Sequence, residues 1–470
     1  MCSYSYAVNG AYVSTGRRKA RYECLQPDLG ARYSFFLPGK GHILKEVLTM
    51  TTAILKGTII SAPALGKLDI TENGYLVAVD GIIEGVYQTL PDRYADCAVT
   101  DCGNDLILQS FSDMHLHAPQ YPMLGMGMDL PLIDWLNTYT FATEAKFSDP
   151  ELAREVYRSL ARELAANGTT RVCMFSSLHR EATLILMEEL ERAGITGYVG
   201  KVNMDRNGSA QLQEETDESI SETLRWLDEC HFEHIKPIIT PRFTPSCTNE
   251  LMEALGRIAR ERDLPIQSHL SENLSEIEWV KALHPDCAQY WETYAKYGMW
   301  NSRTAMAHCV WSDSRERQAM KDAGVWVVHC ADSNQNIVSG VAPVRVMLSE
   351  GLKVTLGSDI AGGDHLSMFD VTASAIRASK ARRILDGFGT DFLTVAEGYY
   401  LGTSAAAEFF GEKPGFAPGN PLHAIVLSDD RLAGVRQLSA AERFERCIYR
   451  RQEGAIRAVW SCGRQIYSAE

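Results

Sequence analysis

Apolar runs and amphipathic stretches alternate through the middle of the chain, between positions 106 and 407. Short apolar runs predict buried strands, whereas apolar residues at helical spacing predict helices that cover a sheet. The predicted strands are 106–113, 170–175, 197–204, 235–240, 265–269, 304–308, 325–328 and 353–357. The predicted helices include 150–167, 179–193, 214–230, 249–262 and 313–323. Alternation of this kind is typical of βα units and a parallel sheet.

Eight such units in about 300 residues favour a closed barrel of parallel strands surrounded by helices. We predict an α/β fold with a (β/α)8 TIM-like barrel at residues 106–407, and a doubly wound sheet is the competing arrangement. In a barrel the C-terminal ends of all strands meet at one mouth, where the side chains that carry the chemistry lie.

The regions on both sides of this middle part show short strands and turns instead. Strands are predicted at 53–60, 74–79 and 82–87 before it, with an Asp80-Gly81 hairpin signal, and at 423–427, 446–449 and 456–461 after it. Because a β unit on each side of a barrel invites pairing, we predict that residues 50–105 and 408–470 form one small β-sandwich domain. Residues 1–49 lack lasting periodicity, and we expect a poorly structured extension there, with a basic binding tail as the alternative.

The composition limits the classes of partner. The formal net charge is −14, which argues against nucleic acid and anionic membranes, because both select clustered Lys and Arg. The 12 cysteines include no Cys-x-x-Cys pair, so free thiols in a reducing compartment are expected rather than a thiolate zinc site. No apolar run is long enough to span a bilayer. We therefore expect a cytoplasmic protein that acts on small molecules.

A pair of histidines follows the first predicted strand. His115 and His117 alternate with Leu116, so in an extended chain both imidazoles project to the same side, with Asp113 in the same row. Neutral imidazole is a good ligand for zinc and its neighbours in the periodic table. A His-x-His pair by itself is equally typical of a polar loop, so the interpretation depends on the other strand ends.

Further polar residues follow the later strands. His269 ends the fifth, His308 the sixth and His329 the seventh, and Asp359 follows the eighth. Three or four ligands from different strands make a catalytic metal site with a position open for water. His308 is an alternative partner for that water, and His329 is expected to be structural. Glu272 lies three residues after His269, where it can move a proton without binding metal; the alternative is a solvated carboxylate at a helix start.

Several longer motifs carry a specific resemblance over roughly residues 53–465. They are His115-Leu-His-Ala-Pro-Gln-Tyr121, the segment 129–141 around Trp135, Thr240-Pro-Arg-Phe243, Gln267-Ser-His-Leu-Ser-Glu-Asn273 and Gly357-Ser-Asp-Ile-Ala-Gly-Gly363. In these motifs the chain resembles the amidohydrolase superfamily and, more narrowly, the guanine deaminase family. One departure is His329-Cys-Ala-Asp-Ser-Asn334, where the family usually has proline in the third position.

The resemblance implies a fold, a reaction and a site. It implies hydrolytic deamination of guanine to xanthine and ammonia by a homodimer, and the alternative is a related aminopurine, pterin or triazine as substrate. It implies one Zn²⁺ per chain, held by His115, His117, His269 and Asp359. It further implies that His308 and Asp359 place the water and that Glu272 shuttles protons. The implied purine contacts are Gln120, Arg242, Phe243, His117, His269, Glu272 and Asp359.

The hydrogen-bonding chemistry of the implied purine contacts agrees with guanine as the substrate. Arg242 offers only donors, so it favours the adjacent O6 and N7 acceptors of guanine over the amine of adenine. Gln120 can donate and accept along another edge. The alternative for Arg242 is a structural pair with a loop carboxylate.

Two competing functions are less consistent with these residues. A ring-amide hydrolase with two metals would resemble the chain in His-x-His, but it usually has a modified lysine at the end of the fourth strand. That strand ends here in Thr240-Pro241-Arg242-Phe243. A non-catalytic binding subunit would be expected to have lost a metal ligand or Glu272, and all of them are present.

Overall fold

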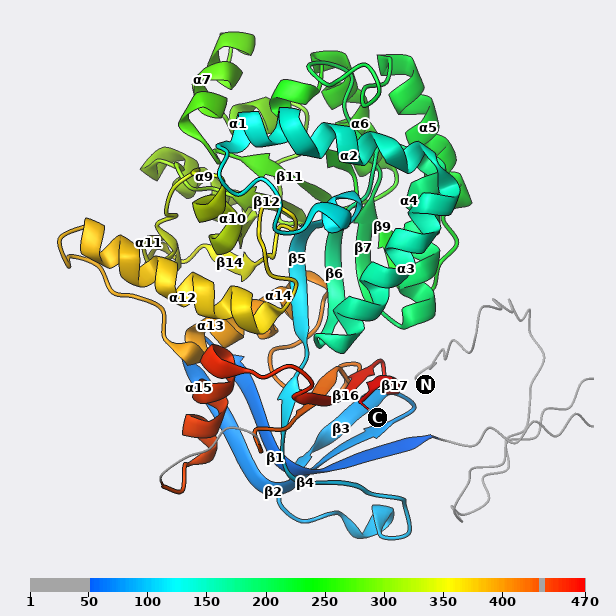
Figure 1. The fold of residues 1–470 in the computed structure, drawn as a ribbon, viewed down its shortest axis with the longest axis vertical. Helices are drawn as coiled ribbons and strands as arrows, with labels where there is room; N and C mark the ends of the chain where they lie inside the picture. The colour runs from blue at the N-terminus through cyan, green and yellow to red at the C-terminus, as the bar shows by residue number, and fades with distance from the viewer. Residues whose placement is uncertain (1–50, 431–435, 470) are drawn as a thin grey trace, which may run out of the picture. The chain divides into compact units, whose positions relative to one another are not determined.

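The computed structural model describes residues 51–430 and 436–469 (Figure 1). The extension expected at residues 1–49 lies outside the described residues, so that expectation stays a prediction. None of the helices in the described ranges combines the length and the apolar content that crossing a membrane requires.

Parallel strands form the inner layer of the fold, as the hydrophobic pattern predicted. They lie in two four-stranded sheets, in the orders β5-β6-β7-β9 and β11-β12-β13-β14, with a two-stranded sheet of β8 and β10 beside them. Their bounds are β5 Phe111–His117, β6 Thr169–Phe175, β7 Thr196–Gly200, β8 Val202–Asn203, β9 Ile235–Pro237, β10 Thr240–Pro241, β11 Ile266–Leu270, β12 Thr304–His308, β13 Trp326–His329 and β14 Lys353–Leu356. The mixed α/β class predicted from the sequence is confirmed.

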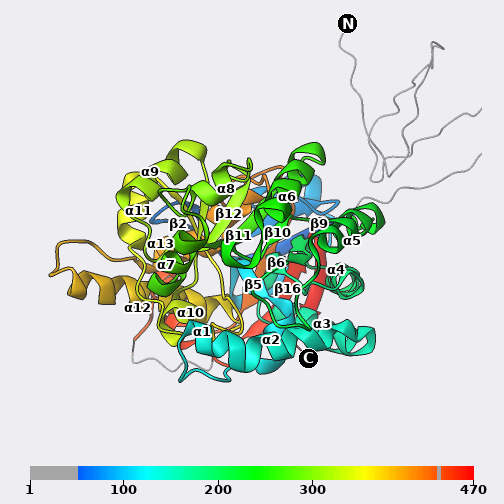
Figure 2. The ribbon, with the colours of Figure 1, turned by 90° about the horizontal axis from the view of Figure 1, so that it is seen from above.

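Helices lie outside these strands when the molecule is seen from above (Figure 2). Helix α3 shows why the sequence forms them: Asp149 caps its first turn by accepting from two backbone N–H groups, and one apolar face is buried. The helices between and after the strands are α3 Pro150–Ala166, α4 Arg180–Ala193, α5 Thr216–Glu229, α6 Asn249–Glu261, α7 Leu274–Leu283, α8 Glu292–Ala295, α9 Ser314–Ala323, α10 Ala331–Asn336, α11 Val344–Glu350, α12 Met368–Leu385, α13 Val395–Gly402 and α14 Ser404–Phe409.

The first predicted strand, 106–113, is wrong as a single element. Residues 106–109 belong to β4 (Thr100–Gln109), and β5 begins only at Phe111. At the break, the Ser110 N–H donates to the His423 carbonyl, whereas the Phe111 N–H donates to the Gly168 carbonyl. The chain thus passes from one sheet into another within two residues. A continuous apolar run does not reveal such a change of partners, because both strands are buried.

The regions before and after the parallel strands share a sheet, as predicted. Strand β4 pairs antiparallel with β15 (Ala424–Leu427), with Leu106 opposite Leu427. The whole sheet has seven strands in the order β17-β16-β15-β4-β1-β2-β3. Its other strands are β1 Thr52–Ala64, β2 Lys67–Val79, β3 Ile82–Tyr87, β16 Ile456–Ser461 and β17 Arg464–Ser468. Figure 1 shows β5 continuing from this sheet into the parallel strands.

The strand predicted at 446–449 is wrong, because this segment lies within helix α15 (Ala440–Arg450). A capping box starts that helix: Ser439 accepts from the Glu442 N–H while Glu442 accepts from the Ser439 N–H. Phe444, Cys447 and Ile448 are buried on one face at helical spacing. The short apolar run at the end of this helix resembles a buried strand, because it is too short to show the helical period by itself.

A buried ion pair ties the end of β7 to the segment before α5. Lys201 is fully buried, and its ammonium lies 2.8 Å from the Glu214 carboxylate. We expect Lys201→Met to lower the free energy of unfolding by about 3–5 kcal/mol, because it leaves the Glu214 charge buried without a partner. Urea denaturation measures this change. The matched control is Lys56→Met at the exposed Lys56–Asp101 pair, where solvent screens the charges and little change in the free energy of unfolding is expected. Equal losses in both variants would contradict the prediction.

Candidate active site

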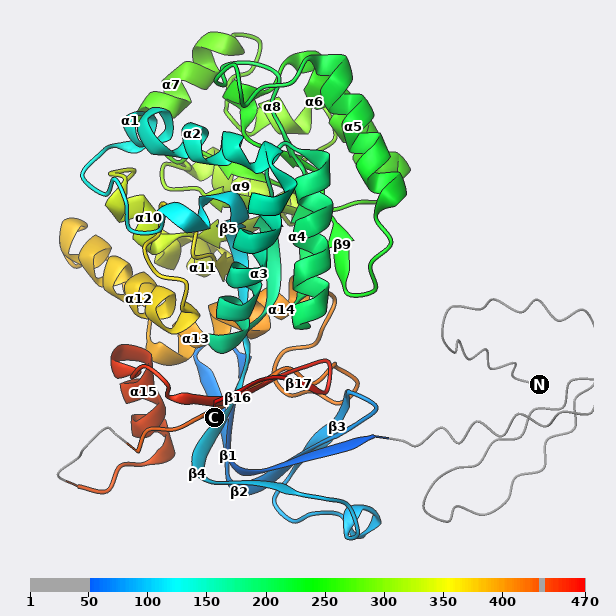
Figure 3. The ribbon, with the colours of Figure 1, turned by 45° about the vertical axis from the view of Figure 1, so that its right-hand side comes forward.

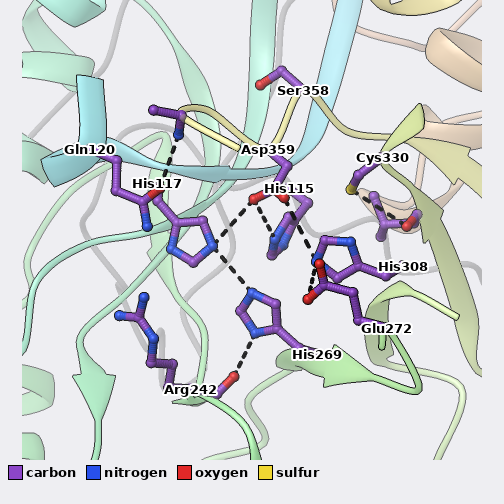
Figure 4. Close-up of polar contacts among 12 residues, drawn as sticks. His115, His117, Gln120, Arg242, His269, Glu272, His308, Cys330, Ser358 and Asp359 are labelled. Carbon is purple, nitrogen blue, oxygen red and sulfur yellow. Dashed lines mark hydrogen bonds and ion pairs between the residues drawn. The ribbon is translucent and has the colours of Figure 1, made fainter. Parts of the chain in front are cut away.

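His115 and His117 lie on β5 with both imidazoles buried and directed toward the same cluster (Figure 4). This is the outcome expected from their alternate positions on a strand. Asp113, predicted in the same row, has a different role. Its carboxylate accepts from the Ser358 backbone N–H at 2.9 Å and from the Ser358 hydroxyl. Asp113 therefore holds the chain after β14 against β5 instead of joining the histidines.

A backbone hydrogen bond of Asp359 places its carboxylate beside His115 and His117. Its N–H donates to the His115 carbonyl at 2.8 Å, and the carboxylate Oδ1 lies 3.2 Å from His115 Nε2 and 3.4 Å from His117 Nε2. Gly357 permits this approach, because a Cβ at that position would lie 2.7 Å from His115 Cβ. The ends of β5 and β14 thus meet around one carboxylate.

His269 completes this side of the cluster from β11. Its Nε2 lies 3.2 Å from His117 Nε2, and its Nδ1 donates to the Arg242 carbonyl at 2.6 Å. A carbonyl oxygen only accepts, so the proton of a neutral His269 lies on Nδ1 and the lone pair lies on Nε2. The hydrogen bond therefore orients His269 as a ligand toward His117 and Asp359.

Burial keeps these imidazoles neutral. It lowers the pKa of His115, and it lowers the pKa of His117 and His269 well below the ordinary value. His115 Nε2 is also buried without a hydrogen bond. A neutral, unprotonated imidazole nitrogen in a dry site is what a divalent metal ion requires. The residues present therefore fit a metal ion.

His308 lies on the other side of Asp359, at the end of β12. Its Nδ1 and Asn334 Oδ1 are 2.9 Å apart, and its Nε2 lies 3.7 Å from Asp359 Oδ2 and 3.5 Å from Glu272 Oε2. Although burial opposes it, the nearby carboxylates of Glu272 and Asp359 raise the pKa of His308. His308 is thus placed to donate from Nε2 to a group between the two carboxylates.

Glu272 is a buried carboxylate beside this cluster. Burial raises its pKa to about 7, and Ser339 Oγ donates to Glu272 Oε1 at 2.9 Å. A carboxyl group with a pKa near neutrality can both accept and donate a proton at physiological pH. Glu272 is therefore not the solvated carboxylate that the sequence left open as an alternative.

Ligand atoms of His115, His117 and Asp359 lie within 4.8 Å of one another. The same holds for His115, His269 and His308, and for His308, Cys330 and Asp359. Burial raises the pKa of the Cys330 thiol well above its ordinary value, so the thiol stays protonated and is a poor ligand. The imidazoles and Asp359 are the groups that could hold the ion.

The backbone is strained around the cluster. Ser271, His308, Cys309 and Asp359 all adopt positive φ, between 48° and 72°. Residues other than glycine rarely adopt this left-handed conformation, and it is found at functional sites where the surrounding structure enforces it. The strain here lies at the ends of β11, β12 and β14, and it directs the following side chains into the cluster.

A pocket opens on this cluster. Its lining combines the polar groups above with apolar side chains that the sequence analysis did not assign. The lining residues are His117, Gln120, Leu132, Trp135, Leu136, Arg242, Phe243, His269, Glu272, Glu276, His308, Ile337 and Asp359. The apolar part excludes water and suits a flat aromatic ligand.

Gln120, Arg242 and Phe243 all line this pocket, and their role as purine contacts stays a prediction. Figure 4 shows Gln120 and Arg242 on the His117 side of the cluster and Glu272 on the His308 side. Arg242 is also paired with a carboxylate, as the structural alternative for this arginine supposed, but the partner Glu144 lies in a helix and not in a loop. Sequence reasoning missed Glu144. Its position just beyond the 129–141 motif was the available signal, but its burial depends on the fold.

Lys201 does not reach this cluster, because its ammonium is bound to Glu214. The fourth predicted strand ends in Arg242 and Phe243 and carries no lysine at that end. The arrangement is one cluster of neutral imidazoles and a carboxylate, with a proton-transfer group at its edge.

Comparisons with known proteins agree with this geometry. Residues 106–443 match the sequence profile of the Amidohydrolase family. Guanine deaminase of Dictyostelium discoideum is 38% identical over 373 residues, which cover 74% of this chain and 82% of that protein. Human guanine deaminase is 33% identical over 400 residues, which cover 83% of this chain and 87% of that protein.

Solved structures show the same fold. Guanine deaminase from C. acetobutylicum, determined with guanine bound in its active site, superposes with a TM-score of 0.87 at 41% sequence identity. The superposition covers 89% of this chain and all of that one. Since the family profile spans most of the chain and these relatives align over at least 82% of their own length, the chain belongs to the amidohydrolase family.

Proposed function

We propose that this amidohydrolase is a guanine deaminase, which converts guanine and water to xanthine and ammonia. The observation that carries this conclusion is the pocket in which neutral imidazoles, Asp359 and Glu272 lie opposite Arg242 and Gln120. A 41% identical structural neighbour has guanine in its own active site, which supports guanine as the substrate here.

We infer that one Zn²⁺ is held by His115, His117, His269 and Asp359. Support comes from the mixture of imidazole and carboxylate ligands and from the low pKa values of the three imidazoles. When bound, the metal would lower the pKa of a water to about 7 and so supply hydroxide at neutral pH.

Glu272 is the general base and acid of this proposal. Its Oε2 accepts a proton from the attacking water as the water oxygen bonds to C2 of guanine. Glu272 delivers this proton to the adjacent ring nitrogen and later transfers the second water proton to the amine as the exocyclic C2–N bond breaks. Ammonia leaves and xanthine remains, so atoms and charge balance. The Ser339 hydroxyl on Oε1 leaves Oε2 for this exchange.

His308 and Asp359 orient the water. Asn334 holds His308 through Nδ1, so Nε2 is directed between the carboxylates of Glu272 and Asp359. At neutral pH the elevated pKa of His308 favours a protonated Nε2, which donates to oxygen. The purine itself lies against Phe243, His117 and His269, with Arg242 and Gln120 at its edge.

We further infer that the parallel strands close as the (β/α)8 barrel predicted for residues 106–407, with the small β-sandwich domain from 50–105 and 408–470. A bridge between Ile239 and Ile266 links the two parallel sheets on one side, which supports closure. On the other side the His117 N–H donates to the Ile360 carbonyl. The break at Ser110 moves the first domain boundary a few residues later. Homodimer formation and a cytoplasmic location stay predictions of the sequence.

Ammonia release from a panel of purines, pterins and triazines tests this function. We expect guanine to be the preferred substrate and xanthine to be the product, identified by its ultraviolet spectrum. Faster turnover of adenine, a pterin or a triazine would show that the assignment to guanine is wrong while leaving the amidohydrolase family membership intact.

Metal content is a separate prediction. We expect one divalent ion per active chain, and we expect chelation to abolish turnover and added Zn²⁺ to restore it, because the proposed ligands His115, His117 and Asp359 converge on one position. Elemental analysis of active protein measures the stoichiometry. Two tightly bound ions per chain would contradict the mononuclear site.

We expect Glu272→Gln to lower kcat by about 10²–10⁴, because glutamine keeps the shape but cannot accept the proton of the water. Steady-state kinetics on protein of measured metal content give this value. Glu278→Gln, at an exposed glutamate of α7, is the matched control and is expected to retain wild-type turnover. Near-normal turnover of a metal-replete Glu272→Gln variant would exclude this role.

A further inference from the structure

A buried glutamate lies behind the substrate side of the pocket. Glu144 ends α2 (Phe141–Glu144), which continues from α1 (Leu132–Trp135) through the π-helical turn at Leu136–Thr140. Figures 1 and 3 both show this helical stretch crossing above the end of β5. Its first half contributes pocket-lining side chains, and its last residue is only 1% exposed. The stretch therefore covers the pocket and ends in a buried charge.

Glu144 binds both polar residues at the purine edge. Arg242 donates from Nη1 to Glu144 Oε2 at 2.6 Å and from Nη2 to Oε1 at 3.1 Å, and Gln120 donates from Nε2 to Oε1 at 2.8 Å. The two-point contact holds the guanidinium in one plane, and charge-assisted bonds of this type are stronger than neutral ones. The guanidinium also lies 5.4 Å from the centre of the Phe141 ring. Arg242 is thus fixed before any ligand arrives.

The orientation of the Gln120 amide follows from the same contacts. The Ala361 N–H donates to Gln120 Oε1 at 2.9 Å, and a backbone N–H requires an acceptor. Nε2 therefore faces Glu144, whose carboxylate accepts only. The N–H groups of Gln120 and Arg242 that do not bind Glu144 remain free to donate to a ligand. Because both residues then present only hydrogen-bond donors, we call this pair the donor surface.

We propose that Glu144 is a positioning residue that sets the purine specificity of this enzyme through Arg242 and Gln120. The proposal rests on the guanine deaminase function proposed above. A donor surface matches the O6 and N7 acceptors of guanine, whereas a purine with an amine at C6 presents a donor to donors. Glu144 touches neither substrate nor metal in this arrangement. It enforces the discrimination by orienting the two residues that do contact the substrate.

A purely structural ion pair is the competing explanation. Breaking such a pair destabilises a protein wherever it lies, because one charge stays buried without a partner. Loss of activity in a Glu144 variant is therefore insufficient evidence. The readout that separates the two explanations is the ratio of kcat/KM for guanine to kcat/KM for 2,6-diaminopurine, which differs from guanine in carrying an amine at C6.

Glu144→Gln is the principal variant. Glutamine keeps the size, but it removes the charge and turns an N–H toward either Arg242 or Gln120. We expect kcat/KM for guanine to fall by about ten- to a hundredfold, mainly through KM, with metal content unchanged. We expect the guanine to 2,6-diaminopurine ratio to fall by about tenfold or more, because the donor surface is no longer held. An unchanged ratio would overturn the proposal.

Two further variants complete the test. Glu189 is a matched control, because it is a buried carboxylate paired with Arg154, Arg158 and Arg192 outside the pocket. Glu189→Gln is expected to lower stability but to preserve the substrate ratio. The double variant Arg242→Ala/Glu144→Gln is expected to have a kcat/KM for guanine only slightly below that of Arg242→Ala alone, because Glu144 acts mostly through Arg242. Fully additive losses would overturn the proposal.

If Glu144→Gln does not fold, Glu144→Asp carries the test, because it keeps the charge but withdraws the carboxylate by one methylene. It is expected to lower the same ratio, and an unchanged ratio would again overturn the proposal. A wild-type enzyme that does not deaminate guanine would instead refute the proposed function, so the two failures are distinguishable.

Discussion

The structure depends on one electrostatic constraint: several ionisable side chains are buried together in one site. Burial lowers the pKa of His115, His117 and His269, so these imidazoles face one another and Asp359 as neutral ligands. Their lone pairs and the carboxylate together create a site that only a cation can satisfy. Glu272, at the edge of the same site, has a pKa raised to about 7 by the same burial. The ability to bind metal and the ability to transfer protons therefore have one physical origin.

That cluster exists because the ends of β5 and β14 are held together. Asp113 accepts two hydrogen bonds from Ser358, the Asp359 N–H donates to the His115 carbonyl, and Gly357 leaves room for His115. Left-handed backbone at His308 and Asp359 then directs their side chains inward. The cost of this strain is offset by the hydrogen bonds of the surrounding strands, which hold the reactive groups in place.

The pocket has two sides with different proposed roles. On one side lie His308 and Glu272, the residues proposed to act on the water, and Ser339 and Asn334 orient them. On the other side Arg242 and Gln120 are held by Glu144, from a helical stretch that also covers the pocket with apolar side chains. In the proposed function the first side carries out the deamination and the second recognises the purine edge, and the His269–Arg242 hydrogen bond joins the two.

The sequence by itself determined the α/β class, the approximate places of the parallel strands and the residues at their C-terminal ends, because period and strand order are local properties. It also determined which residues are chemically able to bind metal, move protons and contact a purine. Only the tertiary structure decided that the apolar run 106–113 divides between two sheets and that 446–449 is helical, because both depend on which partner covers the backbone. It alone decided that Asp113 binds Ser358, that Glu144 binds Arg242 from 98 residues away and that the Gln120 amide donates to Glu144 while its oxygen accepts from Ala361. Hydrogen bonds between distant segments have no periodicity in the sequence, so they become visible only when the chain is folded.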